Sequence, residues 1–166
     1  MSRCSESYCF FSFRLRAAAP AYSYRADPAV PAFPDDKVLV VFDGVCVLCT
    51  GWAQFVLKRD AAFAFRLTTA QSPLGQALFR HYGLDTATFE TNLVLIDGRA
   101  SAKLDTVAAV CERLGGVWRA MSAVRLLPRT LADWAYDRIA LNRYALFGRT
   151  DSCMIPPPEW RARFID

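Results

Sequence analysis

Histidine and long apolar runs are what this 166-residue sequence lacks most plainly: His81 is its single histidine, and no apolar run reaches the length of a membrane span. Mechanisms that need two histidines are excluded, and we expect a soluble chain without a membrane span. Only one pair among the six cysteines, Cys46 and Cys49, has C-x-x-C spacing. A zinc site would need two further ligands, and His81, Cys111 and Cys153 show neither a second C-x-x-C nor a paired-histidine spacing. The sequence therefore predicts no metal site, and we expect no dissociable cofactor.

The composition bounds the architecture. With 54% hydrophobic and 22% charged residues, the chain can bury one core, and 166 residues are too few for two ordinary domains. The net charge is +4, and the positive excess is concentrated in residues 113–149, which contain seven arginines and only two aspartates. A nucleic-acid surface would be more strongly basic, with lysines and interleaved aromatic residues. We therefore favour a solvated helical surface that bears arginines and expect no nucleic-acid partner.

The first 33 residues differ from the rest of the chain. They are rich in Ser, Arg, Ala and Pro, and their helix and strand periodicity is weak. The apolar run at residues 9–13 is too short and too interrupted for a signal-peptide core. We expect a disordered tail, or an upstream extension of the true start, before a domain at residues 34–166. Because an arginine- and serine-rich segment with few acids is also typical of a transit peptide, an organelle is the alternative to the expected cytoplasmic location.

One stretch organises the remaining sequence. Residues 38–42 form a valine-rich run bounded by Asp43-Gly44, which is typical of a strand buried on both faces of a sheet. After it, apolar residues recur with helical spacing from Leu48 to Val56. The pattern predicts a strand, a tight turn and a helix, with Cys46 at or just before the N-terminus of the helix and Cys49 one turn further in.

Downstream patterns predict a mixed α/β domain. The expected strands and helices are, in order, a strand at 63–67, a helix at 73–82, strands at 92–96 and 99–103, and a helix at 104–114. Asp97-Gly98 is the dipeptide favoured in a two-residue hairpin, so the last two strands are expected to be antiparallel. The resulting β-α-β-α-β-β-α order is that of a thioredoxin-like sandwich. Helices at 117–127 and 131–147 form a C-terminal extension, and we expect the core or a partner to bury the second of them.

The cysteine pair suggests disulfide exchange. A positive helix end stabilises the Cys46 thiolate, so Cys46 would attack a substrate disulfide and Cys49 would resolve the mixed disulfide. A lone C-x-x-C is also half of a zinc site, but its place in a β-α-β context favours redox chemistry. The alternative is a non-catalytic thioredoxin-like module that binds a protein or a metal and keeps its cysteines for structure.

Asp43 has two interpretations. A strand ending in Asp-Gly also occurs in phosphatases of the haloacid dehalogenase type, but their nucleophilic aspartate stands two residues earlier, where this chain has Val41. That reading is excluded. Asp43 is then either a turn residue that bonds the loop backbone or an acid or base close to the thiols.

Longer blocks of sequence point to a family. The run Phe42-Asp43-Gly44-Val45-Cys46-Val47-Leu48-Cys49 resembles the DCC family of predicted thiol-disulfide oxidoreductases, and so do the blocks at 70–78, 81–84, 115–118, 142–144 and 147–153. The likeness covers about residues 36–166. It implies a thioredoxin-like domain with Asp43, Cys46 and Cys49 as its signature, which acts on protein or small-molecule thiols and disulfides. It does not imply an oligomeric state.

Three positions remain as accessory candidates. Thioredoxins place a cis-proline before the third strand, where this chain has Thr91. The binding of a substrate peptide at that loop of thioredoxins is therefore not expected of this chain. The family often has a serine after the position of Lys103, and here Leu104 stands there; the following Asp105 is expected to cap its helix. Cys153 is either a third redox-active or shielding thiol, or a structural cysteine in a C-terminal loop.

Overall fold

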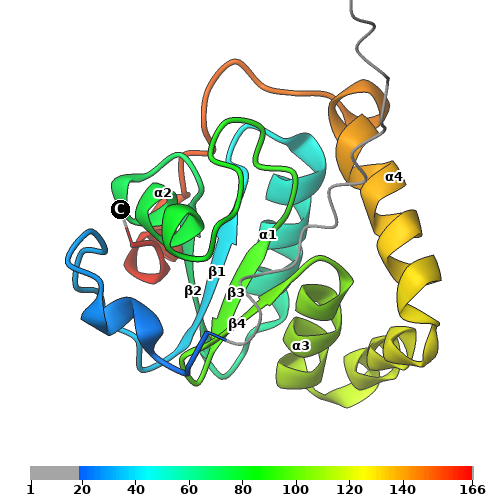
Figure 1. Cartoon of the computed structure of the whole chain (residues 1–166), viewed down its shortest axis with the longest axis horizontal. Helices are drawn as coiled ribbons and strands as arrows, with labels where there is room; N and C mark the ends of the chain where they lie inside the picture. The colour runs from blue at the N-terminus through cyan, green and yellow to red at the C-terminus, as the bar shows by residue number, and fades with distance from the viewer. Residues whose placement is uncertain (1–18, 166) are drawn as a thin grey trace, which may run out of the picture.

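The structure is a computed structural model that describes residues 19–165, and it has a mixed four-stranded sheet with helices on both faces (Figure 1). The strands and first helices are β1 (Val38–Phe42), α1 (Val47–Arg59), β2 (Phe65–Thr69), α2 (Pro73–His81), β3 (Leu93–Ile96), β4 (Arg99–Ala102) and α3 (Leu104–Leu114). The strand order is β2-β1-β3-β4, with β1 parallel to β2 and antiparallel to β3, and with β3 antiparallel to β4. The predicted β-α-β-α-β-β-α order and α/β class are confirmed.

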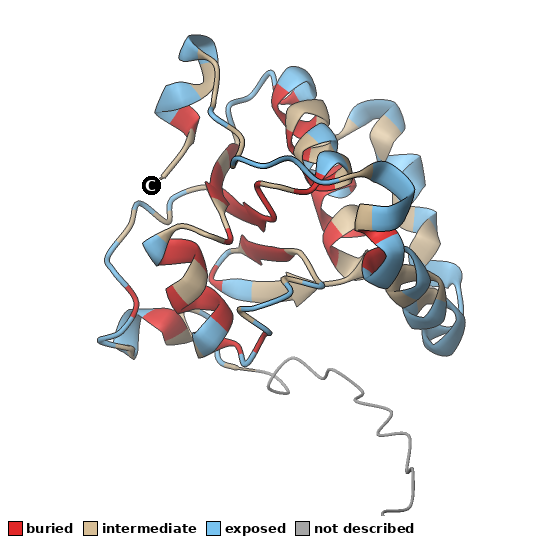
Figure 2. Cartoon of the chain, turned by 90° about the horizontal axis from the view of Figure 1, so that it is seen from above, coloured by how far each residue is buried: buried red, intermediate tan, exposed pale blue. Residues whose placement is uncertain are grey.

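Alternate residues of β1 serve the two faces of the sheet. Leu39 and Val41 join α2 in one apolar cluster, while Val38, Val40 and Phe42 join α1 and α3 in the other. All five residues are buried, as expected for a strand with helices on both sides (Figure 2). Because β1 and β2 run parallel, they end at the same edge of the sheet, and the segments that follow them meet there.

The second strand begins two residues later than predicted. The carboxylate of Asp60 accepts hydrogen bonds from the backbone N–H groups of Ala64 and Phe65, at 2.9 and 3.0 Å, and so closes the connection after α1 into a turn. Phe63, within that turn, has a positive φ of 52°. The apolar character of Phe63 suggested that the strand begins there. Local hydrogen bonding to Asp60 places Phe63 in a turn instead.

Residues 19–33, which the sequence patterns placed in the N-terminal tail, pack on the domain. Tyr24 and Val30 are buried in the α2-side cluster, and Tyr24 belongs to a short 3-10 helix, η1 (Ser23–Ala26). The Tyr22 N–H donates to the Gly98 carbonyl of the β3–β4 turn at 2.8 Å. The expectations for residues 1–18, including Cys4 and Cys9, lie outside the described residues.

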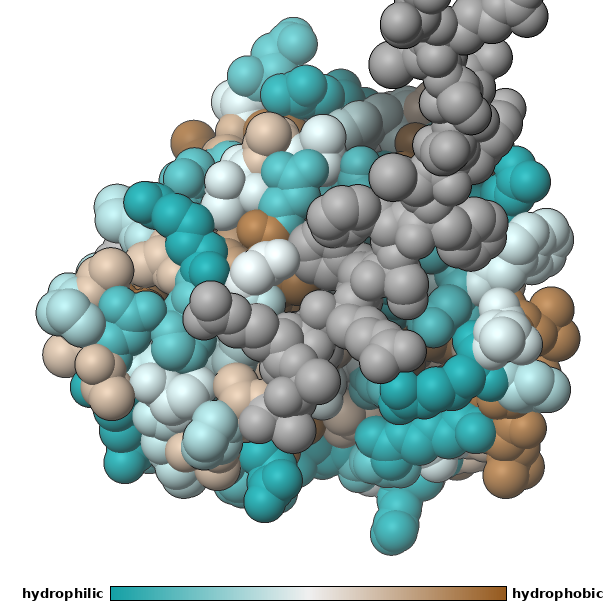
Figure 3. All heavy atoms as spheres, viewed as in Figure 1, coloured by the Kyte–Doolittle hydropathy of each residue, from teal (hydrophilic) through white to brown (hydrophobic). Residues whose placement is uncertain are grey.

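The C-terminal extension differs from the prediction in two ways. The segment predicted as a helix at 117–127 is a 3-10 segment, η2 (Gly116–Leu126), with no buried residue, and it starts from two glycines with positive φ. The next helix, α4 (Arg129–Phe147), buries only Ala140 and Arg143. Trp134 is 56% exposed, and apolar side chains gather on the surface over η2 and α4 (Figure 3). The expectation that the core buries this helix was therefore wrong, while its burial by a partner stays a prediction.

A last 3-10 helix, η3 (Pro158–Arg163), returns to the α1 side of the sheet. Trp160 and Phe164 pack against that cluster, and the Ile165 N–H donates to the Leu67 carbonyl at 2.8 Å. Arg163 pairs with Asp60 at the end of α1. Within residues 19–165, no helix combines the length and the apolar character needed to cross a membrane.

Candidate functional site

Cys46 is the N-cap residue of α1, at the end of the loop that follows β1. Its backbone is extended, and its Sγ accepts a hydrogen bond from the Cys49 N–H at 3.2 Å. The loop is shaped by Asp43, whose carboxylate accepts the Val45 N–H at 3.1 Å. A thiolate in the N-cap position satisfies a free helix N–H and faces the positive end of the helix. The local sequence therefore places Cys46 where its charged form is stabilised.

The two thiols of the pair have opposite acidities. The hydrogen bond from the Cys49 thiol lowers the pKa of Cys46 to about 6, and the Cys49 N–H and the charge of Arg143 act in the same direction against the effect of burial. For Cys49, the hydrogen bond to Cys46 and burial both raise the pKa far above its ordinary value. At neutral pH the pair therefore consists of one thiolate, on Cys46, and one thiol, on Cys49.

Asp43 is 2% exposed and is surrounded by donors. Its Oδ1 accepts from Gln71 Nε2 at 2.7 Å, and its Oδ2 accepts from Arg143 at 3.0 Å and from the hydroxyl of Tyr144. Burial alone would raise the pKa of Asp43, but the hydrogen bonds from Tyr144, Gln71 and Arg143 hold it below its ordinary value. Asp43 is thus an ionised residue that bonds its own loop and is bound to α4, beside the cysteine pair.

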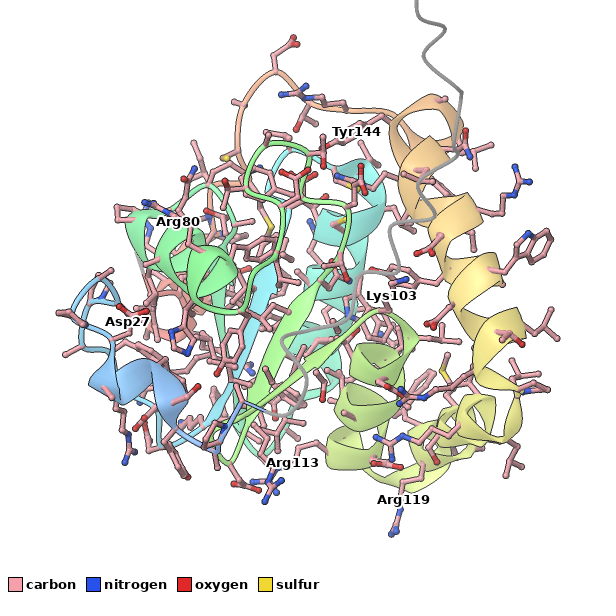
Figure 4. All side chains as sticks on the ribbon, viewed as in Figure 1. Asp27, Arg80, Lys103, Arg113, Arg119 and Tyr144 are labelled. Carbon is pink, nitrogen blue, oxygen red and sulfur yellow. The ribbon has the colours of Figure 1, made fainter. Side chains whose placement is uncertain are left out.

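Arg143 connects α4 to this loop. It is 4% exposed and donates to Asp43, to the Thr88 carbonyl at 2.7 Å and to the Ala140 carbonyl at 2.8 Å. Its Nε has no hydrogen-bond partner among the described residues. Burial and the hydrogen bond to Asp43 raise the pKa of the neighbouring Tyr144 to about 12, so its hydroxyl stays protonated and donates. In Figure 4, Tyr144 lies between the C-terminal end of α4 and the start of α1.

The segment after α4 closes over Cys46, which is 0% exposed. Cys46 forms an antiparallel bridge with Arg149, the Thr150 N–H donates to the Val45 carbonyl at 2.8 Å, and the Met154 N–H donates to the Gly44 carbonyl at 2.8 Å. We refer to residues 148–154 as the covering segment. In this arrangement the thiolate of the pair is shut off from solvent.

Cys153 belongs to the covering segment and lies against the loop after β1. A Cβ atom on Gly44 would stand 3.2 Å from Cys153 Sγ. Burial and the charge of Asp43 raise the pKa of Cys153, so this thiol is protonated at neutral pH. Its placement beside the pair is compatible with the shielding role and equally with the structural one.

The other two accessory candidates are engaged elsewhere. Thr91 Oγ1 accepts the Lys103 N–H at 3.2 Å, which connects the loop before β3 to the start of α3. Asp105 does not cap its helix, and that expectation was wrong: the N-cap of α3 is Lys103, with no side-chain cap, and the Asp105 carboxylate pairs with Arg129 at 2.9 Å. Lys103 has a positive φ of 56° instead of the extended backbone usual at an N-cap, and its ammonium group cannot accept a hydrogen bond from the helix N–H groups.

A family model described as DCC1-like thiol-disulfide oxidoreductase matches residues 40–149. The chain belongs to this family. Relatives of it include the uncharacterized protein YuxK of Bacillus subtilis, which is 37% identical over 127 residues, 76% of this chain and 93% of that protein. A DCC family protein of Arabidopsis thaliana, named as chloroplastic, is 29% identical over 120 residues, 72% of this chain and 70% of that protein. No solved structure matches the chain.

Membership of the DCC1-like family confirms the resemblance and supports a redox role for the chain. The matched residues include the cysteine pair and all of the residues that hold Asp43, from Gln71 to Tyr144. Among the described side chains, no group of three or more His, Cys, Asp or Glu residues is placed to hold a metal ion.

Sequence reasoning assigned no role to Gln71, Arg143 or Tyr144, although these residues surround Asp43. One signal was available for Arg143. It stands seven residues after Tyr136 and three after Ala140 along a helix, so a charged residue shares a face with residues expected to point inward. A buried arginine needs an acid partner, and this face of α4 therefore pointed to a nearby carboxylate. Nothing in the sequence identified that carboxylate as Asp43.

Proposed function

We propose that this DCC1-like protein exchanges disulfides with thiol or disulfide substrates through Cys46 and Cys49. The observation that carries the proposal is the N-cap position of Cys46, where the Cys49 N–H at 3.2 Å and the Cys49 thiol both stabilise a thiolate with a pKa of about 6. A thiolate is the form of cysteine that attacks disulfides, and the adjacent thiol is needed to release the product.

The exchange balances as a two-electron transfer. The Cys46 thiolate attacks one sulfur of a substrate disulfide and expels the other sulfur as a thiolate. Cys49 then loses its proton, attacks Cys46 Sγ and expels the second substrate sulfur. The products are a Cys46–Cys49 disulfide and two substrate thiols, one proton coming from Cys49 and one from solvent. Because exchange is reversible, an external dithiol that reduces the pair runs the same steps backward.

In this account Asp43 and Arg143 are positioning residues. Arg143 places a positive charge near Cys46 that lowers its pKa, while the charge of Asp43 opposes this effect. Their ion pair at 3.0 Å fixes the loop that carries Cys46 against α4. Since Asp43 is ionised at neutral pH, its part is to hold the loop and Arg143 rather than to deliver a proton.

Substrate access requires a change at the covering segment. Cys46 is 0% exposed, and backbone hydrogen bonds from Thr150 and Met154 hold the segment over it. These residues lie in an exposed or half-buried loop, and local opening of such segments costs less than global unfolding. We infer that the covering segment moves away before Cys46 attacks.

The complete burial of Cys46 also favours a second candidate, a non-catalytic module in which both cysteines are structural. Disulfide turnover separates the two. The reduced protein is mixed with hydroxyethyl disulfide, quenched with acid, alkylated and weighed by mass spectrometry. We expect the wild type to form a Cys46–Cys49 disulfide and Cys46→Ser to form none. Cys49→Ser should accumulate a mixed disulfide on Cys46. Cys111→Ser is the matched control, because Cys111 is buried in α3 beside Met121. Cys46→Ser that reacts as fast as the wild type would support the structural module.

The cytoplasmic location remains our proposal, with an organelle as the alternative. The arginine- and serine-rich residues 1–33 and the chloroplastic relative motivate a direct test. Imaging of the full chain with a C-terminal fluorescent tag, beside a version lacking residues 1–18, distinguishes the two. A change of compartment on truncation would support a transit peptide.

A further inference from the structure

The geometry points to a binding site for a small disulfide or dithiol with an apolar body, in the cavity between α1, α3 and α4; this inference rests on the proposed exchange function. The cavity measures about 250 Å³ and reaches Cys49. Apolar side chains from all three helices make most of its wall, among them Trp52 of α1, Val107 of α3 and Ile139 of α4. A larger neighbouring cavity contains neither cysteine.

One cationic residue belongs to this mostly apolar wall. Arg143 lines the cavity together with Cys49 and is 4% exposed. The cavity therefore suits a ligand whose body is apolar and whose sulfur lies at Cys49, at the end of the cavity that Arg143 shares.

The loop before β3 is unsuited to an extended peptide. An extended peptide that binds by strand addition needs free backbone groups on the protein. Here the Asn92 N–H is bonded to the Tyr136 hydroxyl of α4 at 3.3 Å, and Asn92 itself lines the cavity. The volume is also below the usual range of 300–1,000 Å³ for drug-sized ligands. Both observations favour a low-molecular-weight substrate over a polypeptide.

The reducing direction begins at the cysteine that the cavity reaches. One thiolate of the dithiol attacks Cys49 Sγ of the Cys46–Cys49 disulfide and forms a mixed disulfide with Cys49, while Cys46 leaves as the thiolate that its N-cap position stabilises. The second sulfur of the dithiol then displaces the protein and closes a cyclic disulfide. Two electrons and two protons pass from the dithiol to the pair and solvent. The apolar body of the dithiol lies in the cavity during both steps.

Two dithiols provide the test: dihydrolipoamide, which carries an apolar chain ending in an amide, and dithiothreitol, which carries none. The oxidised full-length protein is mixed with each, quenched with acid, alkylated and weighed. The ratio of the two rate constants is divided by the same ratio measured on hydroxyethyl disulfide in free solution. We expect a normalised preference of tenfold or more for dihydrolipoamide, since each buried methylene contributes about 0.8 kcal/mol, roughly a fourfold effect.

Substitutions on α4 locate the site. Ala135→Trp fills the cavity, whereas Ala145→Trp adds the same bulk at an exposed position of the same helix. We expect Ala135→Trp to reduce the normalised preference to between one and two, and Ala145→Trp to leave it unchanged. If Ala135→Trp does not fold, Ile139→Asn against the exposed Leu146→Asn replaces the comparison, with the same expectation.

The outcomes separate the two claims. A normalised preference near one in the wild type, or an equal effect of Ala135→Trp and Ala145→Trp, would overturn the cavity site while leaving exchange intact. Failure of both dithiols to reduce the pair, or failure of the oxidised pair to form, would overturn the proposed function itself. A protein that reacts faster with reduced insulin B chain than with dihydrolipoamide would indicate a polypeptide substrate and contradict the proposal.

Discussion

Removing the Cys49 side chain is predicted to raise the pKa of Cys46. The hydrogen bond from the Cys49 thiol is the largest influence that lowers this pKa to about 6. Hydrogen bonds to charged groups contribute about 1.5–3 kcal/mol, and one pKa unit corresponds to about 1.4 kcal/mol. Cys49→Ala keeps the Cys49 N–H but loses the thiol, so the pKa of Cys46 should rise by about one to two units.

Absorbance at 240 nm follows thiolate formation as the pH is raised. We expect a transition near pH 6 in the reduced wild type, near pH 7–8 in Cys49→Ala, and none in this range in Cys46→Ser. Cys111→Ser should keep the wild-type midpoint, because burial raises the pKa of Cys111 and no charged partner is among the causes. An identical midpoint in Cys49→Ala and wild type would refute the argument that the thiol of Cys49 stabilises the thiolate.

Three further predictions concern the surroundings of the pair. Arg143→Met should lower the free energy of unfolding in urea titrations by about 3–5 kcal/mol, because it leaves Asp43 buried without its ion-pair partner. The control Arg113→Met, at an exposed position, should lower it by less than about 0.5 kcal/mol, and equal losses in the two variants would contradict the role of the ion pair. Thr150→Ala removes a hydroxyl whose acceptors are the carbonyls of Val45 and Ser152, so the covering segment should open more easily. A lost bond of about 1 kcal/mol corresponds to alkylation of Cys46 that is about fivefold faster, and an unchanged rate in mass spectrometry would argue against opening of this segment. Folding lowers the pKa of Cys46 to about 6, so between about pH 6 and 8.5 the unfolded chain holds a proton on Cys46 that the folded chain has lost. The free energy of unfolding of the reduced protein should therefore rise in this range by up to about 1.4 kcal/mol per pH unit, and the rise should be shallower in Cys46→Ser.

The frame of the fold was predictable because its signals are local. Local conformation is specified by the run Val38–Phe42, by the Asp-Gly turns and by the helical spacing after Cys46. Together these signals specify the order of strands and helices along the chain. Predictions were wrong where tertiary contacts or the lack of them decide. Phe63 was assigned to a strand, but the Asp60 carboxylate holds it in a turn. The apolar helix α4 was expected to be buried by the core or by a partner, but the core leaves Trp134, Leu141 and Leu146 exposed.

The candidate site was predictable only in part, for the same reason. Asp43, Cys46 and Cys49 lie within seven residues, so one strand-turn-helix unit brings them together. The residues that hold Asp43 are separated from it by 28 positions for Gln71 and about 100 for Arg143 and Tyr144. For Arg143 and Tyr144 the contact depends on how α4 packs against α1 and α3, and no local pattern specifies that packing. The covering segment was foreseen only in the hypothesis that Cys153 shields the pair, and the complete burial of Cys46 was not predicted.

The central claim is that Cys46 and Cys49 form a redox-active pair, and mass mapping of the oxidised protein tests it most directly. The reduced full chain is equilibrated with hydroxyethyl disulfide, the remaining thiols are alkylated, and the peptides are identified without reduction. We expect a Cys46–Cys49 disulfide as the main product, with Cys111 alkylated and Cys153 not joined to either member of the pair. A main product in which Cys46 and Cys49 are both alkylated after oxidation of other thiols, or in which Cys46 is bridged to Cys153, would contradict the account.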